Sequence, residues 1–334
     1  MTEAIPLYRK VLTPDLEERL RGLSTPSGAT LETIVRSGRE NPDSNIGCYA
    51  ADAESYAVFA PLFDPVISAY HGFGPEERHR ESLPEEGELP SEALDDGGLI
   101  LSTRVRVGRN LAGYPFPAMI GAGERLAVEK RLVHALSSLT GDLAGRYYPL
   151  GRMAEPDRIR LVEDHFLFKK GDRFLESAGV NRDWPHGRGI YHSADKRFLA
   201  WVGEEDHLRI IAMEAGGDII GVFRRLVRAA TALEERLPFA RDSRLGYLSS
   251  CPTNLGTAMR ASVHIRLSRL GERADFEAIC GGLGLAVRGV HGEHSASEGG
   301  VYDISNRQRL GISEAEIIAK LVTGIGKLVE MELN

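Results

Sequence analysis

The stretch Leu99-Ile100-Leu101-Ser102-Thr103-Arg104-Val105-Arg106-Val107 decides the fold class, together with the similar stretch Arg260-Ala261-Ser262-Val263-His264-Ile265-Arg266. Polar and apolar side chains alternate from Arg104 to Val107 and from Arg260 to Arg266, which is the two-residue period of a half-buried β-strand. Strands are predicted at residues 99–107, 198–202, 208–213, 261–267 and 301–305. Helical patterns occur between some of them without a regular strand-helix alternation and without an internal repeat. The sequence therefore predicts an α+β fold rather than a doubly wound one.

Capping residues mark helices around these strands. Thr13-Pro14 is typical of a helix start, Asp218 can cap a helix with an apolar stripe, and Ser313 with Glu316 forms a capping box before a final helix. Pro61 and Pro65 interrupt the apolar spacing of residues 56–70, which predicts broken helices there. We expect an α-helical domain at residues 1–75, an acidic linker at 76–98 and a larger α+β domain at 99–334.

Composition excludes several classes of protein. The chain has 334 residues, 42% of them hydrophobic, and a net charge of -7, which argues against a main role in holding nucleic acid or an anionic membrane. The three cysteines, Cys48, Cys251 and Cys280, have no paired spacing that would suggest disulfides or a zinc site. No leader-like segment or apolar run of membrane-spanning length is present. We expect a protein of the cytoplasm.

Phosphate binding is predicted to depend on arginine. Neither GxxxxGK[ST] nor GxGxxG occurs among the 37 glycines. The two-residue period instead aims Arg104 and Arg106 to one face, and Arg260, Ser262, His264 and Arg266 likewise share one face of their strand. Guanidinium groups match phosphate oxygens with paired hydrogen bonds. The alternative is that both stripes are solvent-facing sides of strands that pair with nearby carboxylates.

The segment Cys251-Pro252-Thr253-Asn254-Leu255-Gly256-Thr257, followed by Arg260 to His264, resembles the signature of the phosphagen (guanidino) kinases. Three further blocks agree with it, at Ser102–Arg106, at Gly203–Arg209 and at Arg288–Glu293 with the following Glu298–Asp303. The resemblance runs from about residue 10 to the C-terminus and is strongest to arginine kinases. It implies a small helical domain packed on a glutamine-synthetase-like catalytic core, whose antiparallel sheet is flanked by helices, with the active site between them.

The guanidino substrate is assigned to the N-terminal region by the same resemblance. Asp43-Ser44-Asn45-Ile46-Gly47-Cys48-Tyr49 is similar to the short substrate loop of arginine kinases. A phenol at Tyr49 can hydrogen-bond one end of a free amino acid. The resemblance implies the following substrate-binding residues: Ser44, Asn45, Ile46, Gly47, Tyr49, Glu205, Cys251 and Glu293.

The resemblance also implies the catalytic roles. Glu205 and Glu293 would form paired hydrogen bonds to the guanidino nitrogens, and either could act as the base. Cys251 would act electrostatically as a thiolate, whose pKa the turn at Pro252-Thr253 could lower. Taken without the family, Glu205 would be one residue of a solvated acidic turn and Cys251 a small buried hydrophobic residue.

The nucleotide is expected on the arginine-bearing strands. Residues implied to bind it are Ser102, Thr103, Arg104, Val105, Arg106, His165, Arg209, Arg260, Ala261, Ser262, Val263, His264, Arg288, Gly289, Val290, His291, Gly292, Glu293 and Asp303. Mg²⁺ is expected to be carried by the nucleotide, steadied through water by Glu204, with no direct protein ligand. The glycines between Arg288 and His294 predict a segment that closes over the substrate.

Three departures and three rival functions remain. Val290 and His291 stand where the family usually has threonine and arginine, and Asn45 where glycine is common; His291 is expected to weaken nucleotide binding or make it sensitive to pH. The rivals are a kinase for another guanidino compound, a protein-arginine kinase and a catalytically silent nucleotide-binding relative. The segment 43–49 favours a small substrate, and the retained Glu205, Cys251 and Glu293 favour catalysis. The resemblance implies a monomer whose partners are ATP and a guanidino compound, with L-arginine preferred.

Overall fold

A computed structural model describes residues 5–80, 94, 96–288 and 299–334. Its helices are α1 Leu7–Val11, α2 Pro14–Leu20, α3 Leu31–Glu40, α4 Ser55–Val58, α5 Ala60–His71, α6 Ala122–Leu136, α7 Glu155–Glu163, α8 Arg173–Ala178, α9 Ile219–Glu234, α10 Phe276–Gly282 and α11 Glu314–Leu333. Its strands are β1 Ile100–Arg109, β2 Gly145–Pro149, β3 Gly189–Ser193, β4 Phe198–Val202, β5 Leu208–Ala215, β6 Arg241–Asp242, β7 Gly246–Tyr247, β8 Met259–Arg266, β9 Leu285–Arg288 and β10 Val301–Asn306.

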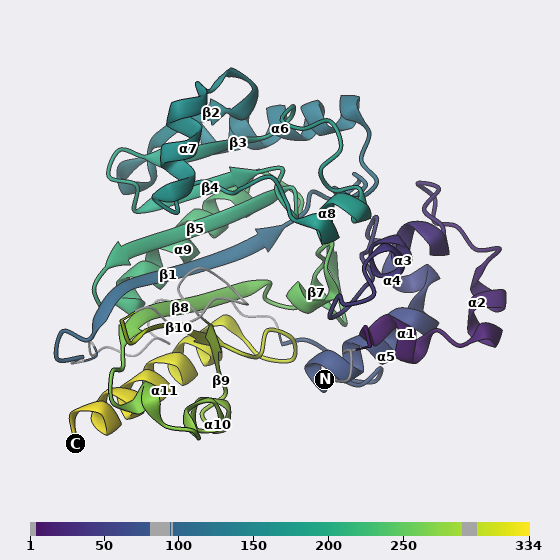
Figure 1. The fold of residues 1–334 in the computed structure, drawn as a ribbon. Coiled ribbons are helices and arrows are strands. Elements are labelled where there is room, and N and C mark those ends of the chain that lie inside the picture. Colours follow the sequence, from purple (N-terminus) through teal and green to yellow (C-terminus); the bar gives the residue numbers. More distant parts are fainter. Residues whose placement is uncertain (1–4, 81–93, 95, 289–298) are drawn as a thin grey trace.

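One antiparallel sheet dominates the fold (Figure 1). Within the described residues it has 8 strands in the order β2-β3-β4-β5-β1-β8-β10-β9. The helices α1 to α5 gather to one side of it, so the α+β fold class is confirmed. The predicted strands at 99–107, 198–202, 208–213, 261–267 and 301–305 correspond to β1, β4, β5, β8 and β10. The short strands β2, β3 and β9 were not predicted.

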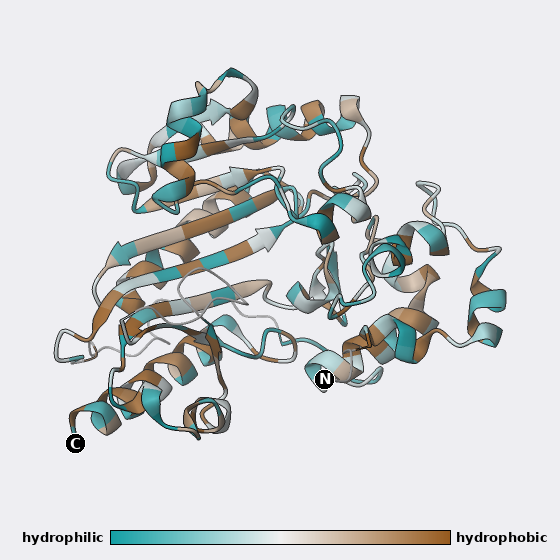
Figure 2. Cartoon of the chain, viewed as in Figure 1, coloured by the Kyte–Doolittle hydropathy of each residue, from teal (hydrophilic) through white to brown (hydrophobic). Residues whose placement is uncertain are grey.

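The two faces of the sheet differ in their cover. Figure 2 shows apolar and polar segments alternating along the strands of the sheet. On one face, alternate residues such as Val105, Ala261 and Ile210 are buried in the main core with side chains of α6, α9 and α11. On the other face, Ile190, Leu199, Trp201 and Ile211 of β3, β4 and β5 pack against a smaller apolar cluster. The rest of this second face, on β1 and β8, is left for polar side chains, which is where the predicted site residues lie.

The N-terminal helices have a core of their own. Ile34, Phe63 and Val66 are fully buried in it, and Leu248, Leu255 and Leu310 from distant parts of the chain complete it. The helical region is therefore packed directly on the segment that follows β7 and on the segment that follows β10.

The predicted interruption at Pro65 is wrong. The helical structure is interrupted at Phe59, between α4 and α5, and α5 then continues through Pro65 to His71. Pro61 stands in the first turn, where a missing N–H costs nothing. Pro65 removes one backbone hydrogen bond, but the packed face of Leu62, Phe63, Val66 and Ile67 holds the helix together.

Candidate active site

Arginines from neighbouring strands converge on the face of the sheet opposite α9 and α11. In the antiparallel register Arg106 of β1 lies opposite Arg260 of β8, and Gly108 lies opposite Arg209 of β5. Because paired residues share a face, Arg104, Arg106, Arg209 and Arg260 all project to the same side. Like charges placed opposite one another destabilise a sheet. A face of this kind is therefore suited to a polyanion.

Arg288 extends this face on the far strand. It lies opposite Asp303 of β10, which in turn lies opposite His264 of β8. Asp303 Oδ2 accepts a hydrogen bond from Arg260 Nη2 at 2.8 Å. The five predicted arginines thus come from β1, β5, β8 and β9, and Asp303 balances part of their charge.

Trp201 of β4 supports two of these arginines. The Cζ atoms of Arg104 and Arg209 lie 5.1 Å and 5.7 Å from the centroid of its ring. The indole N–H donates to the backbone oxygen of Phe166 at 2.7 Å, which fixes the ring. A cation near the ring centroid stabilises by about 0.5–1 kcal/mol or more when desolvated. Trp201 was not predicted, and its only signal was its place on a strand next to Gly203–Arg209.

Arg104 lacks acceptors for part of its guanidinium group. Within the described part of the chain, its Nε and Nη2 atoms are buried without a hydrogen-bond partner, as is Nε of Arg260. Burial, followed by the charges of Arg209 and Arg260, lowers the pKa of Arg104 to about 10. Buried donors without acceptors cost free energy. Phosphate oxygens would supply the missing acceptors.

The turn between β4 and β5 carries the predicted acidic residues. Gly203 begins it with φ +72, a conformation that side chains rarely adopt, and its N–H donates to the backbone oxygen of His207 at 2.9 Å. Arg209 then holds both glutamates: Glu204 Oε2 lies 2.6 Å from Nη1, and Glu205 Oε2 lies 3.0 Å from Nη2. Only the Glu205 contact has hydrogen-bond geometry.

Burial changes the acidity of this turn. It raises the pKa of Glu205 to about 7, although the charge of Arg209 opposes the change. Burial also lowers the pKa of Arg209, but Glu204, Glu205 and Asp206 together outweigh it and raise the pKa overall. A carboxyl with a pKa near neutrality can accept a proton and return it at working pH.

Cys251 lies beside this turn, at the start of the short 3-10 helix Pro252–Asn254. Its Sγ is 3.1 Å from the hydroxyl of Thr253. The prediction of a lowered pKa is wrong for the protein alone: burial, then the charge of Glu205, outweighs the hydroxyl and raises the pKa of the thiol to about 12. A cation next to the thiol would oppose both effects.

Arg309 and Asn254, which sequence reasoning missed, also line the candidate site. Arg309 donates from Nη1 to Asn254 Oδ1 at 2.7 Å and to the backbone oxygen of Thr253 at 2.9 Å. Asn254 Nδ2 lies 3.3 Å from Glu205 Oε2. Both line a small cavity with Arg106, Arg209 and Arg260. Arg309 lies in a loop after β10, where no periodicity marks the direction of a side chain; the adjoining motif at 298–303 was the only signal.

The predicted substrate loop adjoins the Cys251 segment. The N–H of Ala50 donates to the backbone oxygen of Ser250 at 2.7 Å, and the N–H of Tyr49 to that of Ile34 at 2.9 Å. Burial, then the charges of Cys251 and Glu205, raises the pKa of Tyr49 well above its ordinary value. Ser44 is buried, and within the described residues its hydroxyl has no hydrogen-bond partner. Asn45 is exposed and does not adopt a positive φ.

Several predicted nucleotide residues face away from the site. The side chains of Thr103, Val105, Ala261 and Val263 are fully buried, the last three of them in the main core, and the Thr103 hydroxyl donates to the backbone oxygen of Gly216 at 2.8 Å. Alternate residues of a strand point to opposite faces, so only the backbone of these four residues lies toward the arginine-bearing side, and their part in nucleotide binding stays a prediction. Ser102 and Ser262 remain on the arginine-bearing face.

The two predicted histidines lie near the same face. Burial lowers the pKa of His264, and the neighbouring charge of His165 acts in the same direction. His165 follows α7 with φ 59 and is exposed. Gly289, Val290, His291, Gly292 and Glu293 lie outside the described residues.

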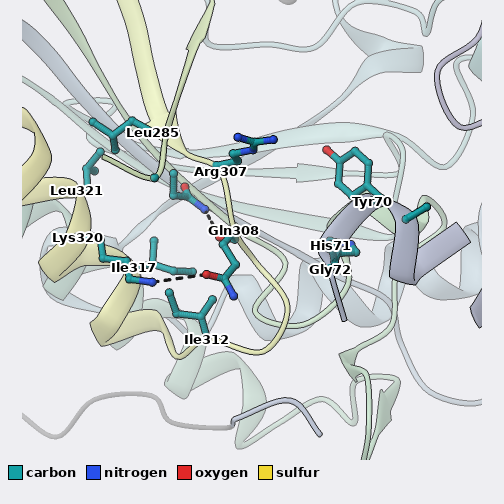
Figure 3. A pocket seen from close by; sticks show the side chains of 13 residues that line it. Tyr70, His71, Gly72, Leu285, Arg307, Gln308, Ile312, Ile317, Lys320 and Leu321 are labelled. Carbon is teal, nitrogen blue, oxygen red and sulfur yellow. Dashed lines mark hydrogen bonds between the residues drawn. The ribbon is translucent and has the colours of Figure 1, made fainter. Parts of the chain in front are cut away.

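A larger cavity, of about 480 Å³, lies elsewhere (Figure 3). Tyr70 and His71 at the end of α5 form one wall, and Ile317, Lys320 and Leu321 of α11 form another. It contains none of the predicted site residues.

The described residues contain neither a candidate metal site nor a candidate membrane-spanning helix. Among them, no group of three or more His, Cys, Asp or Glu side chains is arranged to hold a metal ion. The donor set of the site consists mainly of guanidinium groups, which bind phosphate rather than metal. Helices in this part of the chain are too short or too polar to cross a membrane.

Comparison with known families identifies the chain. Residues 127–334 match the C-terminal catalytic domain of the ATP:guanido phosphotransferases, and residues 3–68 match the N-terminal domain of the same family. The chain belongs to this family, the phosphagen kinases, and is a guanidino phosphotransferase.

Several individual proteins of the family are similar to the chain over nearly its whole length. The chain is 47% identical to the arginine kinase of Penaeus japonicus over 99% of its length and 94% of that protein. It is 50% identical to the arginine kinase of Anthopleura japonica, of which it spans 47%. A solved lombricine kinase matches with a TM-score of 0.93 at 39% identity, covering 98% of this chain and 92% of that one. The duplicated taurocyamine kinase of Schistosoma mansoni, solved with bound transition state analog components, matches with a TM-score of 0.94 at 39% identity, over 99% of this chain and 47% of that one.

The substrate loop depends on a close contact that can be tested. Tyr8 of α1 donates its backbone N–H to Ile46, and its ring lies against Gly38 and Gly47. A Cβ on Gly38 would lie 2.7 Å from Gly47 Cα and closer still to its carbonyl oxygen. We expect Gly38→Ala to displace the loop, raise the KM for the guanidino substrate at least about tenfold and leave the KM for ATP unchanged.

The matched control is Gly22→Ala, because a Cβ there meets nothing within 4 Å. Steady-state kinetics with each substrate varied separately would measure both constants. Equal KM values for Gly38→Ala and Gly22→Ala would show that the loop does not contact the guanidino substrate.

Proposed function

We propose that this chain transfers the γ-phosphoryl group of ATP reversibly to the guanidino group of free L-arginine, giving phosphoarginine and ADP. The observation that carries the proposal is the meeting of an arginine-lined face, suited to phosphates, with the half-buried Glu205 and the buried Cys251, suited to a guanidinium cation. Ala50, which directly follows the substrate loop at 44–49, donates its N–H to Ser250 in the segment that holds Cys251.

The chemistry assigns each group a role. A guanidino nitrogen attacks the γ-phosphorus, the N–P bond forms, and the bond to the β,γ-bridging oxygen breaks, so that ADP leaves. The attacking nitrogen loses a proton to a carboxylate, which we assign to Glu205 or Glu293. Arg104, Arg106, Arg209, Arg260 and Arg288 stabilise the charge on the phosphates. Cys251 faces the substrate cation.

The nucleotide is proposed to bring its own metal. Since the described residues offer guanidinium groups rather than clustered carboxylates, Mg²⁺ would be held by phosphate oxygens and water, with Glu204 reached through water. The ion would reduce the negative charge on the phosphates when bound. Glu204 is already paired with Arg209, so this carboxylate also fixes one of the phosphate-binding arginines.

Arginine is preferred over other guanidino compounds for two reasons. Arginine kinases are 47–50% identical to the chain, whereas the lombricine and taurocyamine kinases are 39% identical. Tyr49, half-buried beside the Cys251 segment, offers a phenol to the charged end of a free amino acid.

The chain organisation is part of the proposal. We assign residues 1–75 to a substrate domain, 76–98 to a linker and 99–334 to a catalytic domain, with the helical core of the first domain completed by side chains of the last. A monomer in the cytoplasm is expected, and the free thiols of Cys48, Cys251 and Cys280 suit a reducing compartment. Size-exclusion chromatography with light scattering would measure the subunit number.

The deciding experiment offers ATP with L-arginine, creatine, taurocyamine, lombricine and an arginine-rich protein separately, and measures ADP formation. We expect kcat/KM for L-arginine to exceed that for every other acceptor by at least about tenfold. A higher value for another small guanidine would reassign the substrate. Activity with the arginine-rich protein and with none of the small guanidines would make this a protein-arginine kinase. No activity with any acceptor would contradict the proposed function.

A further inference from the structure

Asn110 occupies a position between the two halves of the candidate site. It follows directly on β1, and only 1% of its surface is exposed. On one side lies the β4–β5 turn that carries Glu205, and on the other lies the segment 248–251 that ends at Cys251. Neither segment is adjacent to Asn110 in sequence.

The amide of Asn110 bonds to both segments. Its Nδ2 donates to Asp206 Oδ1 at 2.7 Å and to the backbone oxygen of Leu248 at 3.2 Å. Its Oδ1 accepts from the backbone N–H of His207 at 2.9 Å. Asp206 Oδ1 also accepts from the backbone N–H of Ser250 at 2.8 Å. The Asn110 side chain therefore holds Asp206, the residue that follows Glu205, and Leu248, which lies three residues before Cys251. Asp206 in turn holds Ser250, the residue that precedes Cys251.

We propose that Asn110 is a positioning residue for phosphoryl transfer, which sets Glu205 and Cys251 at a fixed separation by holding Leu248 and Asp206, the carboxylate that also bonds Ser250. The inference rests on the proposed function, because it assigns a role toward the guanidino substrate. Orientation of reacting groups can contribute several kcal/mol to a barrier, and small displacements of such groups cost rate.

The surroundings make this clamp stiff. The backbone oxygen of Asn110 accepts from the N–H of Ala240 at 2.7 Å, so the main chain is held as well as the side chain. Gly108, two residues earlier, leaves room for the carboxylate: a Cβ there would lie 3.0 Å from Asp206 Oδ2. His207 is fixed on the other side, accepting at Nδ1 from the N–H of Leu111 at 3.0 Å.

Only an amide satisfies these partners together. The site needs two donated hydrogen bonds and one accepted bond from a single planar group, which the asparagine side chain supplies. An aspartate of the same shape would keep the bond from His207 and turn the donors toward Asp206 and Leu248 into acceptors. Within the described residues, no hydrogen bond joins the Asn110 side chain to the arginines of the sheet face.

The test compares Asn110→Asp and Asn110→Ala with wild type and with Asn181→Ala. Asn181 is a buried amide outside both the β4–β5 turn and the segment 248–251, with Nδ2 donating to the backbone oxygen of Gly171 at 3.1 Å and to Glu176 at 3.0 Å. The measurements are kcat, the KM of each substrate, the dissociation constant of MgADP and the melting temperature.

We expect both Asn110 variants to lower kcat about 10- to 100-fold while the MgADP dissociation constant changes less than about twofold. Asn181→Ala is expected to lower the melting temperature comparably and leave kcat within about twofold. If kcat of Asn110→Asp stays within twofold of wild type, or if MgADP affinity falls in parallel with kcat, the positioning role is wrong. An inactive wild-type protein would instead contradict the proposed function.

Discussion

Replacing Glu205 with glutamine is expected to lower kcat about 10²- to 10⁴-fold, the usual contribution of a positioned general base. The glutamine keeps the size of the side chain but cannot take the proton that the attacking nitrogen loses. It also loses the charge that pairs with Arg209 at 3.0 Å and attracts the guanidinium. The KM for ATP should change much less, since Arg104, Arg106, Arg260 and Arg288 do not depend on Glu205 and Arg209 keeps its contact with Glu204.

The raised pKa of Glu205 predicts that kcat/KM depends on pH with opposite signs for the forward and the reverse reaction. With the pKa of Glu205 raised to about 7, the ionised form needed to accept a proton is lost as pH falls below 7. Forward kcat/KM should then decrease, approaching tenfold per pH unit. The reverse reaction needs the protonated form, so its kcat/KM should decrease as pH rises above 7. Neither decrease of kcat/KM should occur in the Glu205→Gln variant.

Glu129→Gln is the control, because Glu129 accepts a hydrogen bond from Tyr147 at 2.6 Å on an edge strand of the sheet, far from the arginine face. Stopped-time assays in both directions from pH 6 to 9 would measure these decreases. If the decrease near pH 7 survives in Glu205→Gln, another group takes the proton, and Glu293 becomes the assigned base.

Replacing Arg104 with leucine is expected to have two effects of opposite sign. It should lower kcat/KM for ATP about 10²- to 10³-fold, the typical loss for one donor to developing charge. It should also raise the melting temperature of the nucleotide-free protein by about 2 °C or more, because two buried donors without acceptors are removed. Repulsion from Arg209 and Arg260 is relieved at the same time.

The matched control is Arg21→Leu, which removes an exposed guanidinium that pairs with the exposed Glu18 at 2.8 Å and should leave both quantities nearly unchanged. Differential scanning fluorimetry with and without MgADP measures the second effect. MgADP should stabilise wild type more than Arg104→Leu, by linkage. A lower melting temperature for nucleotide-free Arg104→Leu would contradict this account of Arg104.

The fold class and the arginine face were predictable because they depend on local periodicity. Alternation along β1 and β8 already fixed which side chains share a face, and antiparallel pairing then placed Arg106 opposite Arg260. The same rule should have excluded Val105, Ala261 and Val263 from side-chain contact with nucleotide. Capping at Thr13, Asp218 and Ser313 also occurs as predicted, since each side chain accepts from a backbone N–H in the first turn.

Acidity at the site was not predictable from residue type. The turn after Cys251 suggested a lowered pKa, but burial and the nearby Glu205 raise it to about 12. Both influences come from segments far apart in the chain. Trp201 and Arg309 were missed for the same reason, because their importance lies in what they contact.

By itself the sequence determined the strands that bear arginine, the capped helices and the family, all of which follow from short-range spacing and motifs. The tertiary structure alone decided how Glu205 and Cys251 are brought together. That arrangement depends on hydrogen bonds from Asn110 to Asp206 and from Ser250 to Asp206, residues separated by up to 140 positions in the chain. Contacts of this kind are set by packing of the β4–β5 turn against the segment after β7, and no local pattern encodes them.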